Sequence, residues 1–228
     1  MTSRSMYCAL AFVSALAVSP PLLADDDQRG GRFEVSVTNL TRGQQFTPIL
    51  AATHKPSMRL FDLGAPASTE LAVLAEEGNT APLATALAAR PDVGGVVSGS
   101  GLTDPGATTK LVVEGRDGFG LLSIAAMLIP TNDGFVALNG VRLPRGGETL
   151  TYLAVAYDSG SERNDESCAS IPGPNFAECN GSGGGGAPRG GEEGYVHIHA
   201  GMHGIGDFKP ADRDWRNPVA QITVRRVR

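Results

Sequence analysis

Two stretches decide the fold of this chain: Met127-Leu-Ile-Pro-Thr-Asn-Asp133-Gly-Phe-Val-Ala-Leu138 and Ala156-Tyr-Asp158-Ser-Gly-Ser-Glu162. Each contains an apolar run beside a short acidic loop, and about one pair of strands separates them along the sequence. Apolar strands that end at loops carrying carboxylates are typical of a β-sandwich with a site for a hard cation at one rim. These stretches therefore predict strands that meet at a carboxylate-rich edge.

The rest of the chain contains more runs of this kind. Apolar or alternating segments predict strands at residues 32–38, 46–53, 110–114, 121–129, 135–138, 150–157, 195–199 and 219–224. A Ser/Thr start and a glycine stop predict a helix over 68–77, and a second short helix is expected over 80–90. Residues 92–108 are rich in Gly, Ser, Asp and Pro and are expected to form a loop. Many short strands with only two local helices favour an all-β, antiparallel β-sandwich.

The N-terminus has the features of an export signal. Residues 1–24 combine Arg4, an apolar run and a small residue, Ala24, before three aspartates, which predicts a cleaved signal peptide. The apolar run is shorter than the about 20 residues that cross a bilayer, so no membrane span is expected. Residues 25–31 are expected to be a disordered acidic and glycine-containing start, followed by one domain over 32–228. The sequence thus predicts a secreted or periplasmic protein.

Removal of that leader would leave two cysteines. Cys168 and Cys179 are then expected to form a disulfide in an oxidising compartment. The glycine-rich loop at 181–191 offers little to bury and is expected to be mobile and dispensable. The net charge is −5 and no basic patch stands out, so nucleic acid is not expected as a partner.

Several segments resemble the N-terminal domain of the spondins. Phe46-Thr-Pro-Ile-Leu-Ala-Ala-Thr-His54, the helix that ends at Leu74-Ala-Glu-Glu-Gly78, and the run from Leu121 to Ala137 match the family's motifs in order, within a region from about Phe33 to Glu162. The resemblance implies a C2-like sandwich with calcium at one end.

Carried over by position, the calcium ligands would be Asp133, Asp158 and Glu162. Glu162 stands where the family has Asp, and Gly134 stands where it has an aromatic residue. Calcium accepts varied oxygen geometries, so the longer Glu162 is tolerable as a ligand. The other interpretation is that these carboxylates are solvated turn residues, because Asp-Gly and Asp-Ser-Gly are ordinary turn sequences.

A histidine cluster suggests a different chemistry. His197 and His199 would lie on one face of a strand, and His203 follows closely, which is a possible zinc or copper set. Cupins and copper-zinc superoxide dismutases use a His-x-His of this kind. The simpler interpretation is a hydrogen-bonded pair at a strand end. His54 is expected to be structural, because it matches the family motif.

Enzyme function is not supported, because the sequence has no nucleophile elbow, zinc-protease helix or phosphate loop. The leading expectation is an exported, calcium-binding adhesion or recognition module for an unknown protein or glycan ligand, at the cell surface or in the periplasm. The alternative is a small exported transition-metal protein that uses the histidine cluster. Metal analysis of the purified protein would separate the two.

Overall fold

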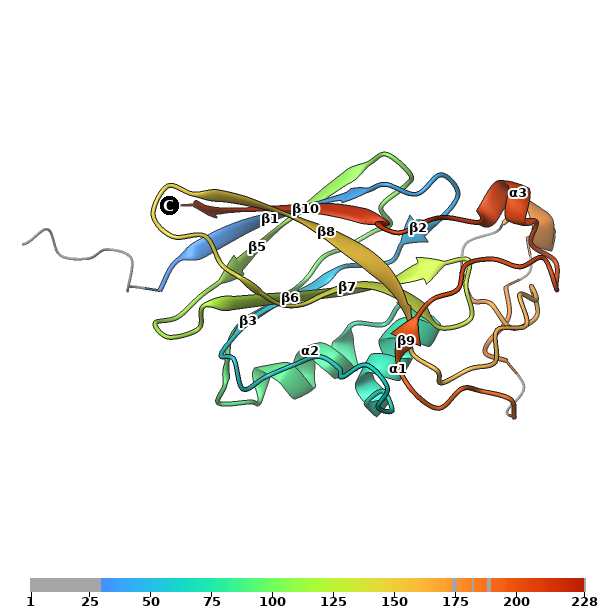
Figure 1. Ribbon diagram of the computed structural model, residues 1–228, viewed down its shortest axis with the longest axis horizontal. Coiled ribbons are helices and arrows are strands. Elements are labelled where there is room, and N and C mark those ends of the chain that lie inside the picture. Colours follow the sequence, from blue (N-terminus) through green and yellow to red (C-terminus); the bar gives the residue numbers. More distant parts are fainter. Residues whose placement is uncertain (1–29, 174–175, 182, 188–189, 228) are drawn as a thin grey trace, which may run out of the picture.

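The computed structural model describes residues 30–173, 176–181, 183–187 and 190–227. The predicted signal peptide lies outside these residues. The described chain is an antiparallel β-sandwich with helices packed against one of its outer faces (Figure 1). Its strands are β1 (Arg32–Asn39), β2 (Gln45–Phe46), β3 (Leu50–His54), β4 (Val93–Ser98), β5 (Thr108–Glu114), β6 (Leu121–Ile129), β7 (Gly134–Arg142), β8 (Thr149–Asp158), β9 (His197–Ile198) and β10 (Ala220–Val227). Its helices are α1 (Thr69–Glu77), α2 (Ala81–Ala88) and α3 (Pro210–Arg213), with a 3-10 turn at Ala177–Cys179.

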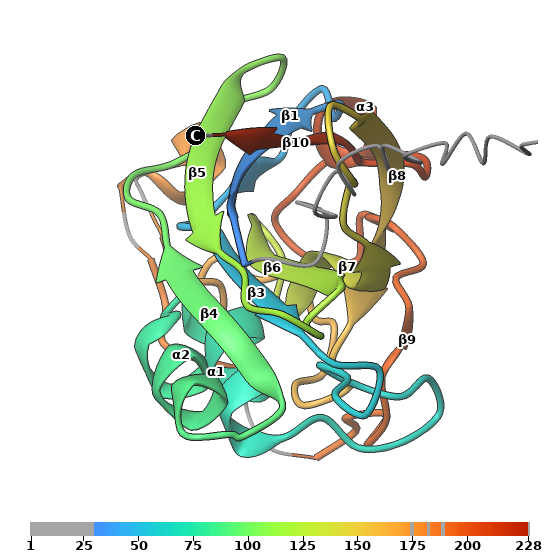
Figure 2. The same cartoon turned by 90° about the vertical axis from the view of Figure 1, so that its left-hand side faces the viewer.

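One continuous hydrogen-bonded path links the two layers. The strand order is β4-β3-β6-β7-β8-β10-β1-β5, with β2 beside β6 and β9 beside β8. Strand β8 belongs to both layers, because residues 149–154 pair with β10 and residues 155–158 pair with β7. Figure 2 shows β5, β1 and β10 on one side of the sandwich and β4, β3, β6 and β7 on the other. The all-β prediction is confirmed.

Two apolar cores explain why β6 is almost uninterruptedly hydrophobic. One face of β6 contributes Ile124 and Leu128 to the interior between the layers, and Ala125 on the other face meets the helices. A strand that is covered on both faces needs no polar alternation. The predicted strand over 121–129 is confirmed for this reason.

Local signals set the limits of the helices. The Ser68 side chain accepts a hydrogen bond from the Leu71 amide at 3.2 Å, and Gly78 ends α1 with a left-handed φ of 68°. Pro82 lies in the first turn of α2, where the absent amide hydrogen costs little. Both predicted helices are confirmed, whereas the four-residue α3 was not predicted.

The expected loop over 92–108 is wrong at its start, where β4 forms an edge strand on β3. Glycine is needed there because the layers approach closely. A Cβ on Gly95 would lie 2.3 Å from the Glu114 carbonyl oxygen of β5, and one on Gly94 would lie 3.0 Å from the ring of Phe119, which follows β5. The glycines that suggested a loop are thus required by strand packing.

The other differences concern strand boundaries. The predicted strand over 46–53 is divided into β2 and β3 around Pro48, and β7 continues to Arg142. The closing strand near the histidines is reduced to the two residues of β9. This short strand places the histidines beside the end of β8.

Candidate metal centre

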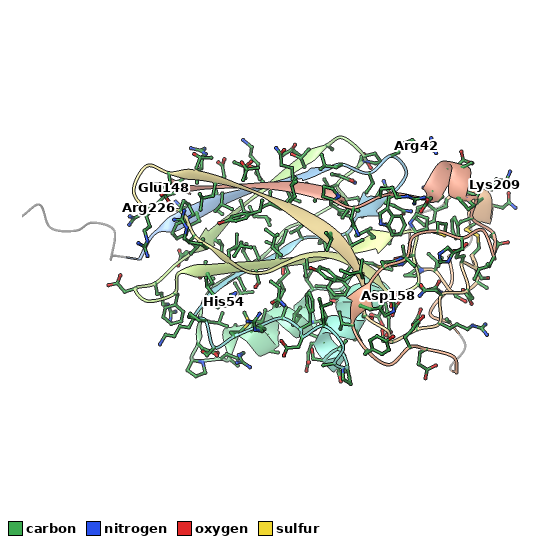
Figure 3. The ribbon with its side chains drawn as sticks, in the orientation of Figure 1. Arg42, His54, Glu148, Asp158, Lys209 and Arg226 are labelled. Atoms are coloured by element: carbon green, nitrogen blue, oxygen red, sulfur yellow. A yellow bond between two sulfur atoms is a disulfide. The ribbon has the colours of Figure 1, made fainter. Side chains whose placement is uncertain are left out.

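The predicted carboxylates meet at one end of the sandwich. Gly134, at the start of β7, is the antiparallel partner of Asp158, at the end of β8. The Ser159 amide donates to the Asp133 carbonyl oxygen at 3.2 Å, which joins the two loops. Figure 3 shows Asp158 near β9, where the long connection after β8 covers this end. We call Asp133, Asp158 and Glu162 the acidic corner.

Asp133 is fully buried, and its two oxygens have different surroundings. Its Oδ2 accepts hydrogen bonds from the Ser159 hydroxyl at 2.9 Å, the Ser161 amide at 2.8 Å and the Glu162 amide at 3.1 Å. Its Oδ1 is buried without a hydrogen-bond partner among the described residues. Burial, reinforced by the charge of Asp158, raises the pKa of Asp133 to about 6. One oxygen therefore fixes the carboxyl group, and the other remains available.

Asp158 is equally buried, and both of its oxygens accept hydrogen bonds. Its Oδ1 accepts from the Gly160 amide at 2.8 Å, and its Oδ2 accepts from the Asn164 side-chain amide at 2.7 Å. Burial raises its pKa above the usual value despite these bonds.

Glu162 reaches the same end of the sandwich from the loop after β8. Its Oε1 accepts from the Ala187 amide at 3.0 Å, and its Oε2 is buried with no hydrogen-bond partner in the described part of the chain. Burial raises the pKa of Glu162 to about 7. Glu162 thus repeats the pattern of Asp133, with one oxygen anchored and one unused.

In the described chain, the acidic corner has no lysine or arginine as a counter-charge. Over the described ranges, no lysine or arginine nitrogen lies within 4.0 Å of any of its three carboxylates. Buried carboxylates without a counter-charge are costly unless they are protonated or bind a cation.

The unused oxygens of Asp133 and Glu162 fit the all-oxygen chemistry of calcium. The geometry is incomplete, however, because the described Asp133, Asp158 and Glu162 do not form a group whose ligand atoms all lie within 4.8 Å. Calcium binding by this trio stays a prediction.

The three histidines do not assemble as one metal set. His197 and His199 both face Asp158, with Nε2 atoms 3.6 Å from Oδ1 and 4.0 Å from Oδ2, respectively. His203 is more than half exposed and lies beside Glu166, with its Nδ1 4.0 Å from Oε1. The expected common face of His197 and His199 agrees with the structure, but the three-histidine alternative is not favoured.

His199 has a packing role at this end. Its Nδ1 accepts from the Gly201 amide at 3.0 Å, and its ring contacts Trp215 at 4.9 Å between centroids. Burial, followed by the charges of the other two histidines, lowers its pKa to about 4. A Cβ on Gly134 would lie 2.8 Å from the His199 ring and 2.7 Å from the Thr131 hydroxyl. The imidazole therefore occupies the space that a larger residue at position 134 would need.

Glu193 is the residue at this end that the sequence interpretation missed. Within the described chain, Asp158, Glu193 and His197 place one ligand atom each within 4.8 Å of one another. Glu193 stands in a polar, glycine-rich stretch and has no periodic neighbour to mark it. Only the fold brings it to Asp158.

The described parts of the glycine-rich loop make backbone hydrogen bonds, but most of their residues are exposed, and the mobility of the segment stays a prediction. The amides of Gly184 and Gly186 donate to the carbonyl oxygens of Ile171 and Ser170, both at 3.0 Å. The predicted disulfide between Cys168 and Cys179 is present, with an S–S distance of 1.98 Å. Both features fasten the long connection that covers the acidic corner.

His54 has the structural role that was expected. The ring is buried, and its Nδ1 lies 2.8 Å from the Lys55 carbonyl oxygen, so this nitrogen carries the hydrogen. Its Nε2 accepts from the Ser123 hydroxyl at 2.8 Å, and that hydroxyl accepts from the Gly140 amide. This network fixes the bulge between β6 and β7, and Figure 3 places His54 far from Asp158.

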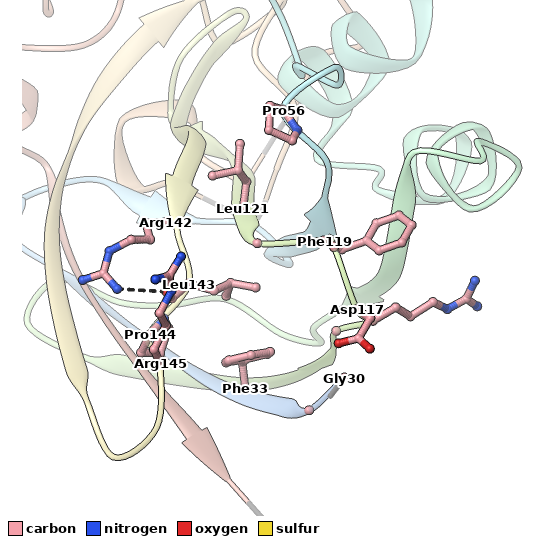
Figure 4. Close-up of a pocket in the computed structure, with 15 residues that line it drawn as sticks. Gly30, Phe33, Pro56, Asp117, Phe119, Leu121, Arg142, Leu143, Pro144 and Arg145 are labelled. Atoms are coloured by element: carbon pink, nitrogen blue, oxygen red, sulfur yellow. Dashed lines mark hydrogen bonds between the residues drawn. The ribbon is translucent and has the colours of Figure 1, made fainter. Parts of the chain in front are cut away.

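A concavity lies at the end of the sandwich opposite the acidic corner. It has a volume of about 750 Å³ and an apolar wall that includes Phe33, Phe119 and Leu143. Figure 4 shows Asp117, Arg142 and Arg145 around it. The ligand-atom group of Asp158, Glu193 and His197 is not part of this concavity.

Comparison with known proteins agrees with the predicted family. The Spondin_N family model matches residues 38–163, which is more than half of the chain, and the chain belongs to this family. No curated protein matches the chain. The matched region contains the whole acidic corner and excludes Glu193 and the histidines at 197–203.

Family and disulfide together indicate the compartment. Spondin N-terminal domains are extracellular modules, and disulfides persist in oxidising compartments, so both are consistent with a secreted protein. None of the helices in the described ranges has the length and apolarity needed to cross a bilayer.

Proposed function

We propose that this chain is an exported β-sandwich module that binds calcium at the acidic corner and serves in adhesion or recognition, at the cell surface or in the periplasm. The observation that carries the proposal is the set of three buried carboxylates with no lysine or arginine beside them in the described chain. The family match supports the same interpretation, because it spans all three residues.

Calcium would add a further link between two loops that hydrogen bonds to Asp133 already join. Asp133 lies between β6 and β7, whereas Asp158 and Glu162 belong to the end of β8 and its following loop. Asp133 and Glu162 each use one oxygen for backbone amides and keep the other free for a cation. A small shift of the loop that carries Glu162 would complete the oxygen set, since calcium accepts 6–8 oxygens in loose geometry.

Recognition would use the rigid surface that the calcium-bound loops create. The ligand belongs to the class of proteins or glycans, which fits an extracellular module with no catalytic constellation in its sequence. Binding of the calcium-loaded domain to immobilised glycans and matrix proteins, repeated in chelator, would test this part.

Thermal unfolding tests the calcium part. A ligand that binds only the native state at a hundredfold excess over Kd adds about 2.7 kcal/mol. The melting temperature should fall in chelator and recover with calcium, and Asp158→Asn should reduce the recovery. The exposed Asp62→Asn is the matched control, because Asp62 lies outside the acidic corner and is largely solvated. A wild-type melting curve that chelator does not move would refute calcium binding.

A further inference from the structure

Asp158 and His197 face each other across the β8–β9 ladder. They are direct partners in the antiparallel register, so their side chains leave the sheet on the same side. The His197 Nε2 lies 3.6 Å from the Asp158 Oδ1. Glu193 approaches from the preceding loop, which is fastened by the Gly194 amide donating to the Gly160 carbonyl oxygen at 2.8 Å. Strands β8 and β9 and the turn at Gly194 therefore bring the side chains of Asp158, His197 and Glu193 together.

The hydrogen bonds of His197 determine which nitrogen is available. Its Nδ1 lies 3.0 Å from the Ile198 carbonyl oxygen, which can only accept, so Nδ1 carries the hydrogen. In the neutral ring, Nε2 then has a lone pair that points towards Asp158. The Nε2 atom is buried and has no hydrogen-bond partner in the described chain. Metal-binding histidines commonly donate their second ring N–H to a backbone carbonyl in this way.

The separation of the two atoms favours a metal ion over a direct hydrogen bond. A hydrogen bond between nitrogen and a carboxylate oxygen is usually about 2.7–3.2 Å long, which is shorter than the 3.6 Å observed. Tetrahedral zinc at about 2.0–2.1 Å from each ligand places neighbouring ligands about 3.4 Å apart. The observed spacing is close to that of two ligands on one ion.

We propose that Asp158, Glu193 and His197 form a site for a divalent transition-metal ion of the zinc class. The imidazole distinguishes this set from a calcium site, because calcium prefers oxygen ligands alone. Three protein ligands with Glu193 exposed leave a fourth position open to water. Asp158 is shared with the acidic corner, but Glu193 and His197 lie outside the region that the family model matches.

Hydrogen bonds from neighbouring residues hold the Asp158 carboxylate in position to bind a metal ion. Asn164 donates to Asp158 Oδ2 at 2.7 Å and lies 3.4 Å from Glu193 Oε1, so one amide orients both carboxylates. The Gly160 amide donates to Asp158 Oδ1. This inference does not depend on calcium binding, because Asp133 and Glu162 take no part in it.

Zinc titration of the metal-free protein tests the proposal. We expect one zinc ion per chain by calorimetry, at least a tenfold weaker affinity in His197→Ala and in Glu193→Gln, and no change in the exposed control His203→Ala. Asp133→Asn should lose calcium binding and retain zinc binding, so failure of one site is distinguishable from failure of the other. Cobalt(II) absorption that disappears in His197→Ala gives a second readout.

Two results would overturn the proposal. One is a wild-type protein that binds no zinc, which would leave an imidazolium–carboxylate pair as the reason for the contact. The other is zinc binding that His197→Ala leaves unchanged while His203→Ala weakens it. Thermal unfolding of each variant in chelator verifies that the fold is retained, and Glu193→Gln, at an exposed position, decides the matter if His197→Ala does not fold.

Discussion

Replacement of Asp133 by asparagine should make the domain more stable than the wild type in chelator and less stable than the wild type in saturating calcium. The new side chain would keep one oxygen for the Ser159, Ser161 and Glu162 donors, and its amide nitrogen would take the place of the unpaired Oδ1. The Asp133→Asn variant thus preserves the local hydrogen bonds while it removes a buried charge and a calcium ligand.

The magnitude follows from the pKa of Asp133, which burial raises from 3.8 to about 6. A difference of about 2 pKa units corresponds to about 3 kcal/mol of cost for the ionised form at neutral pH. The unpaired amide nitrogen that the substitution introduces offsets about 1–3 kcal/mol of that gain. In chelator at pH 7.5 the variant should therefore be about 0–2 kcal/mol more stable than the wild type.

In saturating calcium the order should reverse, because the wild type gains about 2.7 kcal/mol at a hundredfold excess over Kd and the variant does not. For a domain of this size, 1 kcal/mol changes the melting temperature by about 2–4 °C. Fluorescence of Trp215, the single tryptophan, can follow unfolding. An equal calcium-dependent increase in both proteins would refute the role of Asp133, and Asp62→Asn should behave as the wild type throughout.

Three further predictions concern the fold and the acidic corner. Ser123→Ala should cost about 2–4 kcal/mol in denaturant unfolding, because it removes the hydrogen-bond partner of the His54 Nε2 and of the Gly140 amide; Thr151→Ala, on an exposed strand position, should cost almost nothing. Loss of the Cys168–Cys179 bond should cost about 3 kcal/mol, because it closes a loop with a separation of 11 residues; two thiols that alkylate without reductant would contradict the bond. In chelator the stability of Asp133→Asn relative to the wild type should increase as the pH rises from 5 to 8, because the folded pKa of Asp133, about 6, lies above its unfolded value and the wild type loses this contribution as the carboxyl ionises. The comparison cancels the opposite contribution of buried His199, whose pKa is lowered to about 4. A difference in melting temperature that stays constant across this range would contradict the raised value of Asp133.

Elements with local signals were predictable from the sequence. Strand β6 is a continuous apolar run because both of its faces are covered, and α1 is limited by Ser68 and Gly78. The disulfide followed from the two cysteines that remain once the predicted leader, which contains Cys8, is removed. In contrast, Gly94 and Gly95 suggested a loop. They are required instead by contacts with Phe119 and with the Glu114 carbonyl oxygen, respectively, which lie about 20–25 residues further along the chain. Close approach between distant segments leaves no local pattern.

The candidate metal centre was predictable only in part. The apolar runs placed Asp133 and Asp158 at strand ends, and alternation placed His197 and His199 on a common side, which the contacts to Asp158 agree with. The third partner could not be inferred, because Glu193 has no distinctive neighbours and is brought to Asp158 by a turn held at Gly160. His203 was placed with the other histidines by spacing alone, and the loop carries it to Glu166 instead.

Calorimetric titration of the metal-free protein with calcium tests the central claim most directly. The acidic corner predicts one calcium ion per chain, with heat that disappears in Asp133→Asn and in Asp158→Asn and persists in Asp62→Asn. Titration at pH 5.5 and at pH 7.5 should show weaker binding at the lower pH, since protons compete for carboxyls whose pKa values lie at about 6 and about 7. A wild-type protein that takes up no calcium at pH 7.5, or a binding heat that Asp133→Asn leaves intact, would contradict the claim.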